Sequence, residues 1–184
     1  MDNIKVNEVM RPIGGFPVIP SSATFMEGVA TLENVDEEFK AGKTPERILL
    51  VHDNNGKIIG KISPMDIVEG LEPKYDYMDR FKTNQYSELI KSSIMAMKDQ
   101  LQLWNKPFAE LCKRANSIKI RDFIKMPKAA QMVDINDSID VAFHLFIVNR
   151  HGSLFVKEGN EIVGLILFSD VYKRIKENLK SCAI

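Results

Sequence analysis

The sequence is poor in several residues and segments that mark particular classes of protein. It has two cysteines and three histidines in 184 residues, and 25 acidic residues balance 25 basic residues, so the formal net charge is zero. Cys112 and Cys182 lack metal or redox spacing, which fits a reducing compartment, and we expect the cytoplasm. No apolar run approaches the roughly 20 residues of a membrane helix, and the first residues show no apolar signal core. The balanced charge provides no overall field that would attract nucleic acid or an anionic membrane.

Motifs of common catalytic sites are also missing from the sequence. It contains no P-loop, no dinucleotide-binding glycine motif, no H-E-x-x-H and no nucleophile elbow. We therefore expect a protein that is not an enzyme, has no catalytic residues, binds no metal and requires no cofactor.

The chain does contain an internal repeat. GKIIGKISPMDIVEGL at residues 56–71 and NEIVGLILFSDVYKRI at 160–175 each show an apolar run, a Gly, a second apolar run and an Asp that opens an amphipathic segment. The likeness extends upstream, where IKVNEVMRP at 4–12 returns as IKIRDFIKMP at 118–127. A repeat of this kind indicates an architecture built from two similar units.

Each copy predicts the element order β-α-β-β-α. After an extended piece, a helix begins at a capping box of Thr24 and Glu27 in the first copy and at Ser138 in the second. A hairpin of two buried strands follows, with Asn-Gly and Gly-Asn as turn signals, and a closing helix begins near Asp66 and near Asp170. A unit of about 60 residues rarely has enough core of its own, so we expect the two copies to pack on each other.

We expect an α+β fold in which tandem repeats at 1–71 and 118–184 pack as a pseudo-two-fold pair, with a helical insert at 72–117. Apolar residues of the insert recur at spacings of three or four, which predicts an amphipathic helix: Tyr86, Ile90, Ile94, Met97, Leu101 and Trp104. Pro107 then ends this helix or opens a short second one. The helix either covers the paired core or offers a surface to a second subunit or a partner.

The tandem order, with Gly-apolar-apolar-Ser-x-x-Asp at the end of the second hairpin strand, resembles the CBS-domain pair, or Bateman module. The resemblance covers both repeats and leaves the insert outside it. Members of that family commonly bind adenosine-containing ligands, namely AMP, ADP, ATP or S-adenosylmethionine, in clefts between the two sheets. In their usual motif the Asp holds the ribose hydroxyls, and the Ser or Thr three residues earlier contacts ribose or phosphate.

The first copy matches this motif at Gly60, Ser63 and Asp66. A carboxylate at a helix start is stabilised by free backbone amides and can accept two hydrogen bonds from vicinal hydroxyls. The alternative is purely structural, with Ser63 and Asp66 serving as a turn and a helix cap.

The second copy departs from the motif. Gly164 and Asp170 keep their places, but Leu167 stands where the Ser or Thr is expected. Ser169 either compensates for the lost hydroxyl or caps the helix. We therefore predict one functional site, in the first copy.

A phosphate needs a cation, and the resemblance points to basic residues just before the first hairpin strand. Arg150 and His151 hold this place in the second copy, and Arg47 holds it in the first, where arginine suits phosphate best because its planar fork binds two oxygens. The alternative is that these residues are simply solvated at a turn. Lys57 and Lys61 are expected to face solvent on an alternating strand.

The purine ring needs an apolar slot. The candidates would belong to the core under any interpretation: Ile19 or Val18, Ile62, Val133 and Ile166. The sequence thus predicts a homodimeric regulatory module that binds an adenosine nucleotide or related adenosyl ligand and signals to a separate effector protein.

Two rival functions remain. The first is a dimerisation or interaction scaffold of the same fold without a ligand, which Leu167 favours. The second is nucleic-acid binding through basic residues of the insert: Lys91, Lys98, Lys106, Lys113 and Arg114. The zero net charge and the interspersed acidic residues argue against the second rival.

Overall fold

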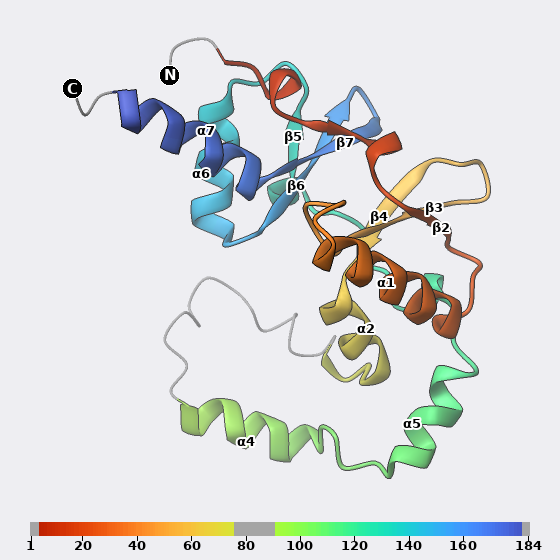
Figure 1. The fold of residues 1–184 in the computed structure, drawn as a ribbon. Coiled ribbons are helices and arrows are strands. Elements are labelled where there is room, and N and C mark those ends of the chain that lie inside the picture. The colour runs from red at the N-terminus through yellow and green to blue at the C-terminus, as the bar shows by residue number, and fades with distance from the viewer. Residues whose placement is uncertain (1–3, 76–90, 182–184) are drawn as a thin grey trace.

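The computed structural model describes residues 4–75 and 91–181, which form two α+β halves and a helical segment beside the first half (Figure 1). The first half contains η1 Val6–Glu8, β1 Arg11–Pro12, η2 Ile13–Gly15, β2 Val18–Pro20, α1 Phe25–Lys40, β3 Leu49–His52, β4 Ile58–Ile62 and α2 Pro64–Leu71. The second half contains η3 Ile120–Asp122, η4 Ala129–Gln131, β5 Met132–Asp134, α6 Ile139–Asn149, β6 Ser153–Glu158, β7 Glu161–Leu167 and α7 Phe168–Ser181. The predicted tandem of β-α-β-β-α units is confirmed.

Each half builds a sheet of the same topology. In the first sheet β2 runs parallel to β3 and β3 antiparallel to β4, and in the second β5, β6 and β7 repeat this pattern. The second sheet has β1 as a fourth strand, antiparallel to β7. Even the irregularities correspond, because both hairpins shift register at the same place, after Val51 and after Val156. The halves are therefore copies of one unit, arranged as a pseudo-two-fold pair.

Three buried clusters hold the pair together. One lies between the first sheet and its helices: Ile19, Leu32, Leu49, Val51, Ile62 and Ile120. Its counterpart in the second half is larger: Val6, Val133, Ile139, Ala142, Phe146, Leu154, Val156, Ile166 and Val171. The third, the interface core, joins the opposite faces of the two sheets: Phe16, Ile48, Leu50, Ile58, Phe155, Leu165 and Leu167.

The leading segments of the two copies are exchanged between the halves. Val6 is fully buried in the core of the second half, and its amide donates to the Asp137 carbonyl at 2.9 Å. Ile120, the equivalent residue of the second copy, is fully buried in the core of the first half, and its amide donates to the Ala23 carbonyl at 2.9 Å. Each half therefore completes its core with residues from the other repeat.

The exchanged segments explain the glycine of the repeated motif. A Cβ added at Gly164 would collide with the carbonyl oxygen of Arg11, because the first segment crosses β7 at this point. A Cβ added at Gly60 would come within 3.0 Å of the Ile124 side chain and 3.2 Å of the Lys125 carbonyl oxygen. Both glycines leave room for a crossing backbone. The crossing segment approaches more closely at Gly164 than at Gly60.

Local signals in the sequence form the expected caps and turns. The Glu27 carboxylate accepts from the Thr24 amide at 2.7 Å, and Thr24 Oγ1 accepts from the Glu27 amide at 3.2 Å, which is the predicted capping box. Ser138 is the N-cap residue of α6, as predicted. The proposed capping role of Ser169 is wrong, because α7 begins at Phe168 and Ser169 already lies inside its first turn.

The insert forms α4 Lys91–Leu101 and α5 Phe108–Ala115, so the second helix after Pro107 is confirmed. The first helix ends three residues before Trp104, whose backbone is left-handed (φ 60°) and whose amide donates to Glu72 at 3.2 Å. Tyr86 and Ile90 lie outside the described residues. Ile94 is 46% exposed and the segment packs at the end of α2, so the interpretation that this helix covers the paired core is wrong (Figure 1). Within the ranges described, no helix has both the length and the apolar character needed to cross a membrane.

Replacing Gly164 by alanine tests the crossing of the first segment over β7. We expect Gly164→Ala to lower the free energy of unfolding by about 2 kcal/mol or more, because the new Cβ must displace backbone. Gly60→Ala should cost less, since the Ile124 side chain can move. Gly14→Ala is the control, because a Cβ there meets nothing within 4 Å. Urea denaturation measures all three, and an unaffected Gly164→Ala would contradict the close approach.

Candidate ligand-binding site

Polar side chains of both copies gather where β4 and β7 end and where α2 and α7 begin. Asp66 and Asp170 occupy the first turns of these helices. The buried side of this region is the interface core. We call its polar neighbours the junction cluster: Glu46, Lys61, Ser63, Asp66, His151, Ser153 and Ser169. The cluster brings together groups from both halves, which a bridging ligand requires.

Ser63 and Asp66 meet as the motif predicts. Asp66 Oδ2 accepts from the Ser63 amide at 2.7 Å and from Ser63 Oγ at 2.6 Å, and Pro64 begins α2 between them. This is a helix cap, so the structural alternative is realised in the chain as it stands. Both side chains are only partly buried, which leaves them within reach of a ligand.

Asp170 is held by a residue that the sequence analysis missed. Arg11 Nε lies 2.6 Å from Asp170 Oδ2, and Arg11 Nη2 lies 2.8 Å from Oδ1, so the two side chains form a bidentate ion pair. This hydrogen bonding raises the pKa of Arg11. Leu167, which replaces the motif hydroxyl, is fully buried in the interface core. The second copy therefore offers neither the hydroxyl nor an uncommitted carboxylate.

Ser169 is exposed and lies near Glu46 of the other half. Burial raises the pKa of Glu46, and the nearby Ser169 hydroxyl and the charge of Lys61 oppose that rise. Ser169 therefore lies beside the other half instead of replacing the missing hydroxyl of its own motif.

Lys61 does not face solvent, so that prediction is wrong, although Lys57 is exposed as expected. The side chain of Lys61 crosses the interface between the sheets, where Nζ donates to the Ser153 carbonyl oxygen at 3.2 Å and contacts Ser153 Oγ. The ammonium also lies 5.1 Å from the centre of the Phe155 ring. Burial lowers the pKa of Lys61 to about 8, against the opposing charges of Asp66 and Glu46.

The three predicted phosphate cations are differently placed. Arg47 is exposed, pairs with Asp36 at 3.2 Å and stacks over Phe39 at 5.2 Å. Arg150 is exposed in a left-handed conformation (φ 55°) just after α6. Only His151 belongs to the junction cluster, and its pKa is lowered by burial and by the charge of Lys61.

The apolar candidates for a purine slot are mostly core residues. Ile19, Ile62 and Ile166 are at most 5% exposed and pack between the sheets and their helices. Val133 is buried likewise, whereas Val18 is 53% exposed. These residues support the strands that carry the junction cluster.

Three cavities bear on the candidate site residues. The cavity beside Asp66 measures only about 20 Å³ and is lined by charged residues of α2 and of the exchanged segment, among them Glu69 and Lys125. A much larger cavity, about 490 Å³, lies at the other end of the sheets, between the hairpin turns and Met126. A third cavity, about 320 Å³, is lined by Asp170 and Arg11. The motif carboxylate of the second copy therefore borders open space, whereas a ligand at Asp66 has to displace the residues around it.

Basic residues of the insert are partly engaged within the chain. Lys106 lies 3.5 Å from Glu110, and Arg114 Nε donates to the Gly70 carbonyl oxygen at 3.3 Å. The side chain of Lys91 lies outside the described residues. The ion pair of Lys106 with Glu110 offsets part of the positive charge that the insert offers to nucleic acid, and the hydrogen bond of Arg114 holds that side chain against α2.

The family model of the CBS domain matches residues 120–177. No curated protein matches the sequence. Among solved structures, the chain is similar to CBSX2 in complex with AMP, with 15% identity, a TM-score of 0.57 and coverage of 95% of this chain and 98% of that one. It is also similar to a CBS domain-containing protein from Bacillus anthracis (14% identity, TM-score 0.58, coverage 95% and 94%).

A third similar structure is a putative acetoin utilization protein, AcuB, from Vibrio cholerae (16% identity, TM-score 0.56, coverage 96% and 93%). At these identities the likeness concerns the fold, and it extends over nearly the full length of each chain. Residues 120–177 therefore match the CBS domain, and the chain as a whole has the fold of solved structures that contain CBS-domain pairs.

Proposed function

We propose that this protein is a regulatory module of the cytoplasm that binds an adenosine nucleotide, or S-adenosylmethionine, at the junction cluster and signals to a separate effector protein. The observation that carries the proposal is the Ser63–Asp66 pair at the start of α2, close in the chain to Lys61, which contacts Ser153 of the other half. The similar structure of CBSX2 in complex with AMP supports the ligand class.

The chemistry of the first copy suits a ribose. Asp66 lies near the free amides of a helix start, where a carboxylate is favoured, and its two oxygens can accept from two vicinal hydroxyls. The Ser63 hydroxyl now donates to Asp66 at 2.6 Å. When ribose hydroxyls donate instead, Ser63 is released to contact the ligand, so binding exchanges one hydrogen bond for another.

The small cavity beside Asp66 means that a bound ligand must change the structure, and this change can serve as the signal. A cavity of about 20 Å³ cannot contain a nucleoside, so a ligand beside Asp66 has to displace residues that line it, among them Glu69 of α2 and Lys125 of the exchanged segment. The contact of Lys61 with Ser153 is a separate link between the halves, and we propose that the ligand breaks it as well. A ligand that binds the parted state better shifts the population toward it, and the altered orientation of the sheets is what an effector protein reads.

Titration calorimetry with AMP, ADP, ATP and S-adenosylmethionine tests the proposal. We expect at least one of them to bind the protein and to raise its melting temperature, because a ligand that binds only the folded state stabilises it. No heat and no thermal shift at millimolar ligand would favour the rival, a ligand-free interaction scaffold.

Asp66→Asn tests the site itself. We expect the affinity for the bound ligand to fall at least about tenfold, because the amide replaces one of two acceptors by a donor. Glu27→Gln is the matched control, since Glu27 makes the same capping box with Thr24 at distances of 2.7 and 2.8 Å, outside the junction cluster. Unchanged affinity in Asp66→Asn would move the site away from the first copy.

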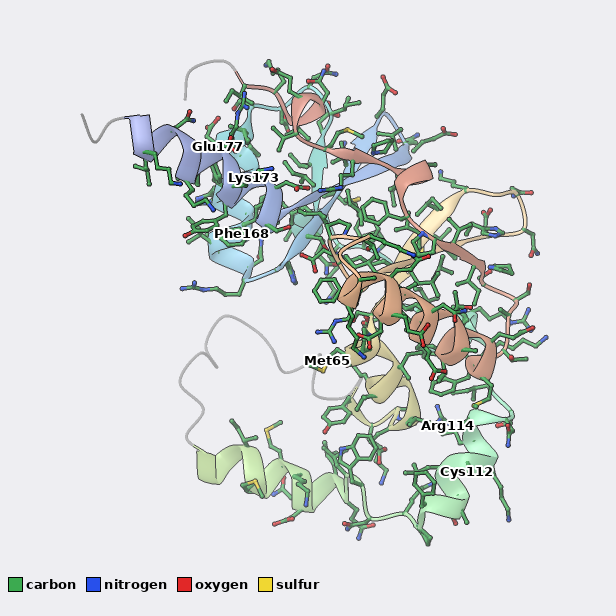
Figure 2. All side chains as sticks on the ribbon, in the orientation of Figure 1. Met65, Cys112, Arg114, Phe168, Lys173 and Glu177 are labelled. Atoms are coloured by element: carbon green, nitrogen blue, oxygen red, sulfur yellow. The ribbon has the colours of Figure 1, made fainter. Side chains whose placement is uncertain are left out.

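The proposal includes a homodimer. Apolar side chains at the starts of α2 and α7 are exposed, with Met65 at 74%, Val68 at 48% and Phe168 at 42% (Figure 2). Tyr172, which is 54% exposed, stacks on Phe168 and extends the patch along α7. Exposed apolar side chains at the starts of two helices are typical of surfaces that another chain covers.

Light scattering after gel filtration checks the dimer. We expect twice the mass of the chain for the unaltered protein and a lower mass for Met65→Glu, because a carboxylate in an apolar contact is costly to desolvate. Phe108→Glu is the control, since Phe108 on α5 is equally exposed, at 79%, but far from the patch along the chain. A monomeric mass for the unaltered protein would contradict the proposed dimer.

A further inference from the structure

Lys61 occupies a position that suits an apolar side chain. Strand pairing sets Lys61 opposite Leu50, and in the other half it sets Leu165 opposite Phe155, so Lys61 and Leu165 are equivalent. Leu165 is fully buried in the interface core. An ammonium in the same environment loses solvation, as the lowered pKa of about 8 indicates.

The contacts of Lys61 do not neutralise its charge. Nζ donates to the carbonyl oxygen of Ser153 and contacts its hydroxyl, and both partners are neutral. Glu46 and Asp66 favour the charged form from a distance, but within residues 4–75 and 91–181 no carboxylate lies within ion-pair distance of Nζ. Lys61 thus brings a charge into the interface without a direct counter-ion from these residues.

Lys61 also shares its face of β4 with the motif hydroxyl. Ser63 follows the last residue of β4 with an extended backbone (φ −125°), and side chains two residues apart along an extended chain point the same way. The equivalent residue of the other half, Leu167, lies in the interface core. Asp66 follows in the first turn of α2. A cation, a hydroxyl and a carboxylate therefore stand in one short segment.

Two arginines of this region are held by carboxylates, and the third, Arg150, is exposed just after α6. Arg11 pairs with Asp170, and Arg47 pairs with Asp36. His151 has a lowered pKa and is neutral at the pH of the cytoplasm. Lys61 is therefore the cation that a phosphate group beside Ser63 would meet.

We infer that Lys61 selects a ligand that carries phosphate, binding a phosphate oxygen through Nζ while Asp66 holds the ribose. The inference rests on the proposed function and narrows its ligand to a phosphorylated adenosine. The phosphate takes the place of the Ser153 oxygens as the acceptor for Nζ, which releases the link between the halves. Neutral adenosine and cationic S-adenosylmethionine gain nothing from this ammonium.

The test compares AMP with adenosine by titration calorimetry on the unaltered protein and on Lys61→Leu. Leucine is the matched replacement because Leu165 fills the equivalent position. We expect the unaltered protein to bind AMP at least about tenfold more tightly than adenosine, since hydrogen bonds between charged groups are the strong ones. Lys61→Leu should remove this preference and leave the affinity for adenosine within about twofold.

Lys57→Leu is the control for the loss of one positive charge, because Lys57 is exposed four residues earlier, and it should bind AMP as the unaltered protein does. If the unaltered protein binds AMP but shows no preference over adenosine, or if Lys61→Leu keeps the preference, the inference is wrong while the proposed function stands. If the unaltered protein binds neither compound nor any other adenosyl ligand, both are wrong.

Two further readouts separate this role from a merely structural one. Without ligand, Lys61→Leu should raise the melting temperature by about 4 °C or more, because it removes the cost of burying the ammonium. A lower melting temperature would show that Lys61 stabilises the interface and would overturn the inference.

The second readout is pH. The groups that face Lys61 are Glu46 before β3, Asp66 on α2 and His151 before β6. With its pKa lowered to about 8, Lys61 loses its proton as the pH rises through that value, whereas His151 is already neutral there. The affinity for AMP should therefore fall between about pH 7 and pH 9.5 in the unaltered protein and stay level in Lys61→Leu. A level profile in both proteins would contradict a role for the ammonium.

Discussion

The exchange of leading segments is the contact on which the rest of the structure depends. Val6 completes the core of the second half and Ile120 completes the core of the first, each with no exposed surface. Removing either segment would expose an apolar core. It would also leave a backbone amide at the start of a helix without its hydrogen-bond acceptor, because the Phe25 amide donates to Ile118 and the Ile139 amide donates to Ile4. Neither half is therefore a complete unit, and the relative orientation of the two sheets is fixed by the two exchanged segments as well as by the interface core.

The exchange also gives the repeated motif a structural cause that precedes any ligand. Gly60 and Gly164 leave space for the crossing segments, and Ser63 with Asp66 caps α2. Because packing and helix capping already explain these residues, the positions that match the motif say little about function. The positions that depart from it are more informative, because Lys61 and Leu167 fill the same interface with opposite chemistry.

The sequence was sufficient for features that depend on local chemistry. The repeat, the capping box at Thr24 and the glycine turns at Gly56 and Gly159 all form as predicted, because neighbouring residues determine them. The exchange was not predictable, since a segment gives no local sign of which half it joins. The Arg11–Asp170 ion pair was not predictable either, because the two residues are 159 positions apart in the sequence. Lys61 was predicted to face solvent because the alternation of residues along a strand does not reveal that the face with the polar residue lies against a second sheet.

The exchanged segments also determine which carboxylate a ligand can reach. Arg11 and Lys125 are equivalent residues of the two segments, but Arg11 binds the motif carboxylate of the second copy while Lys125 lies 2.5 Å from Glu69, one turn further along α2. A ligand at Asp170 has to break a bidentate ion pair and finds Leu167 beside it. Among the residues that the structure describes, a ligand at Asp66 has no ion pair to break: it replaces the hydroxyl of Ser63 and displaces the residues that fill the space around it. The asymmetry between the copies therefore comes from long-range pairing as much as from the motif. Lys61 belongs to the same first copy. Burying its ammonium is unfavourable, and it lies in the half whose carboxylate, Asp66, has no ion pair within the described ranges. A phosphorylated ligand bound there would stabilise the buried ammonium by supplying an opposite charge.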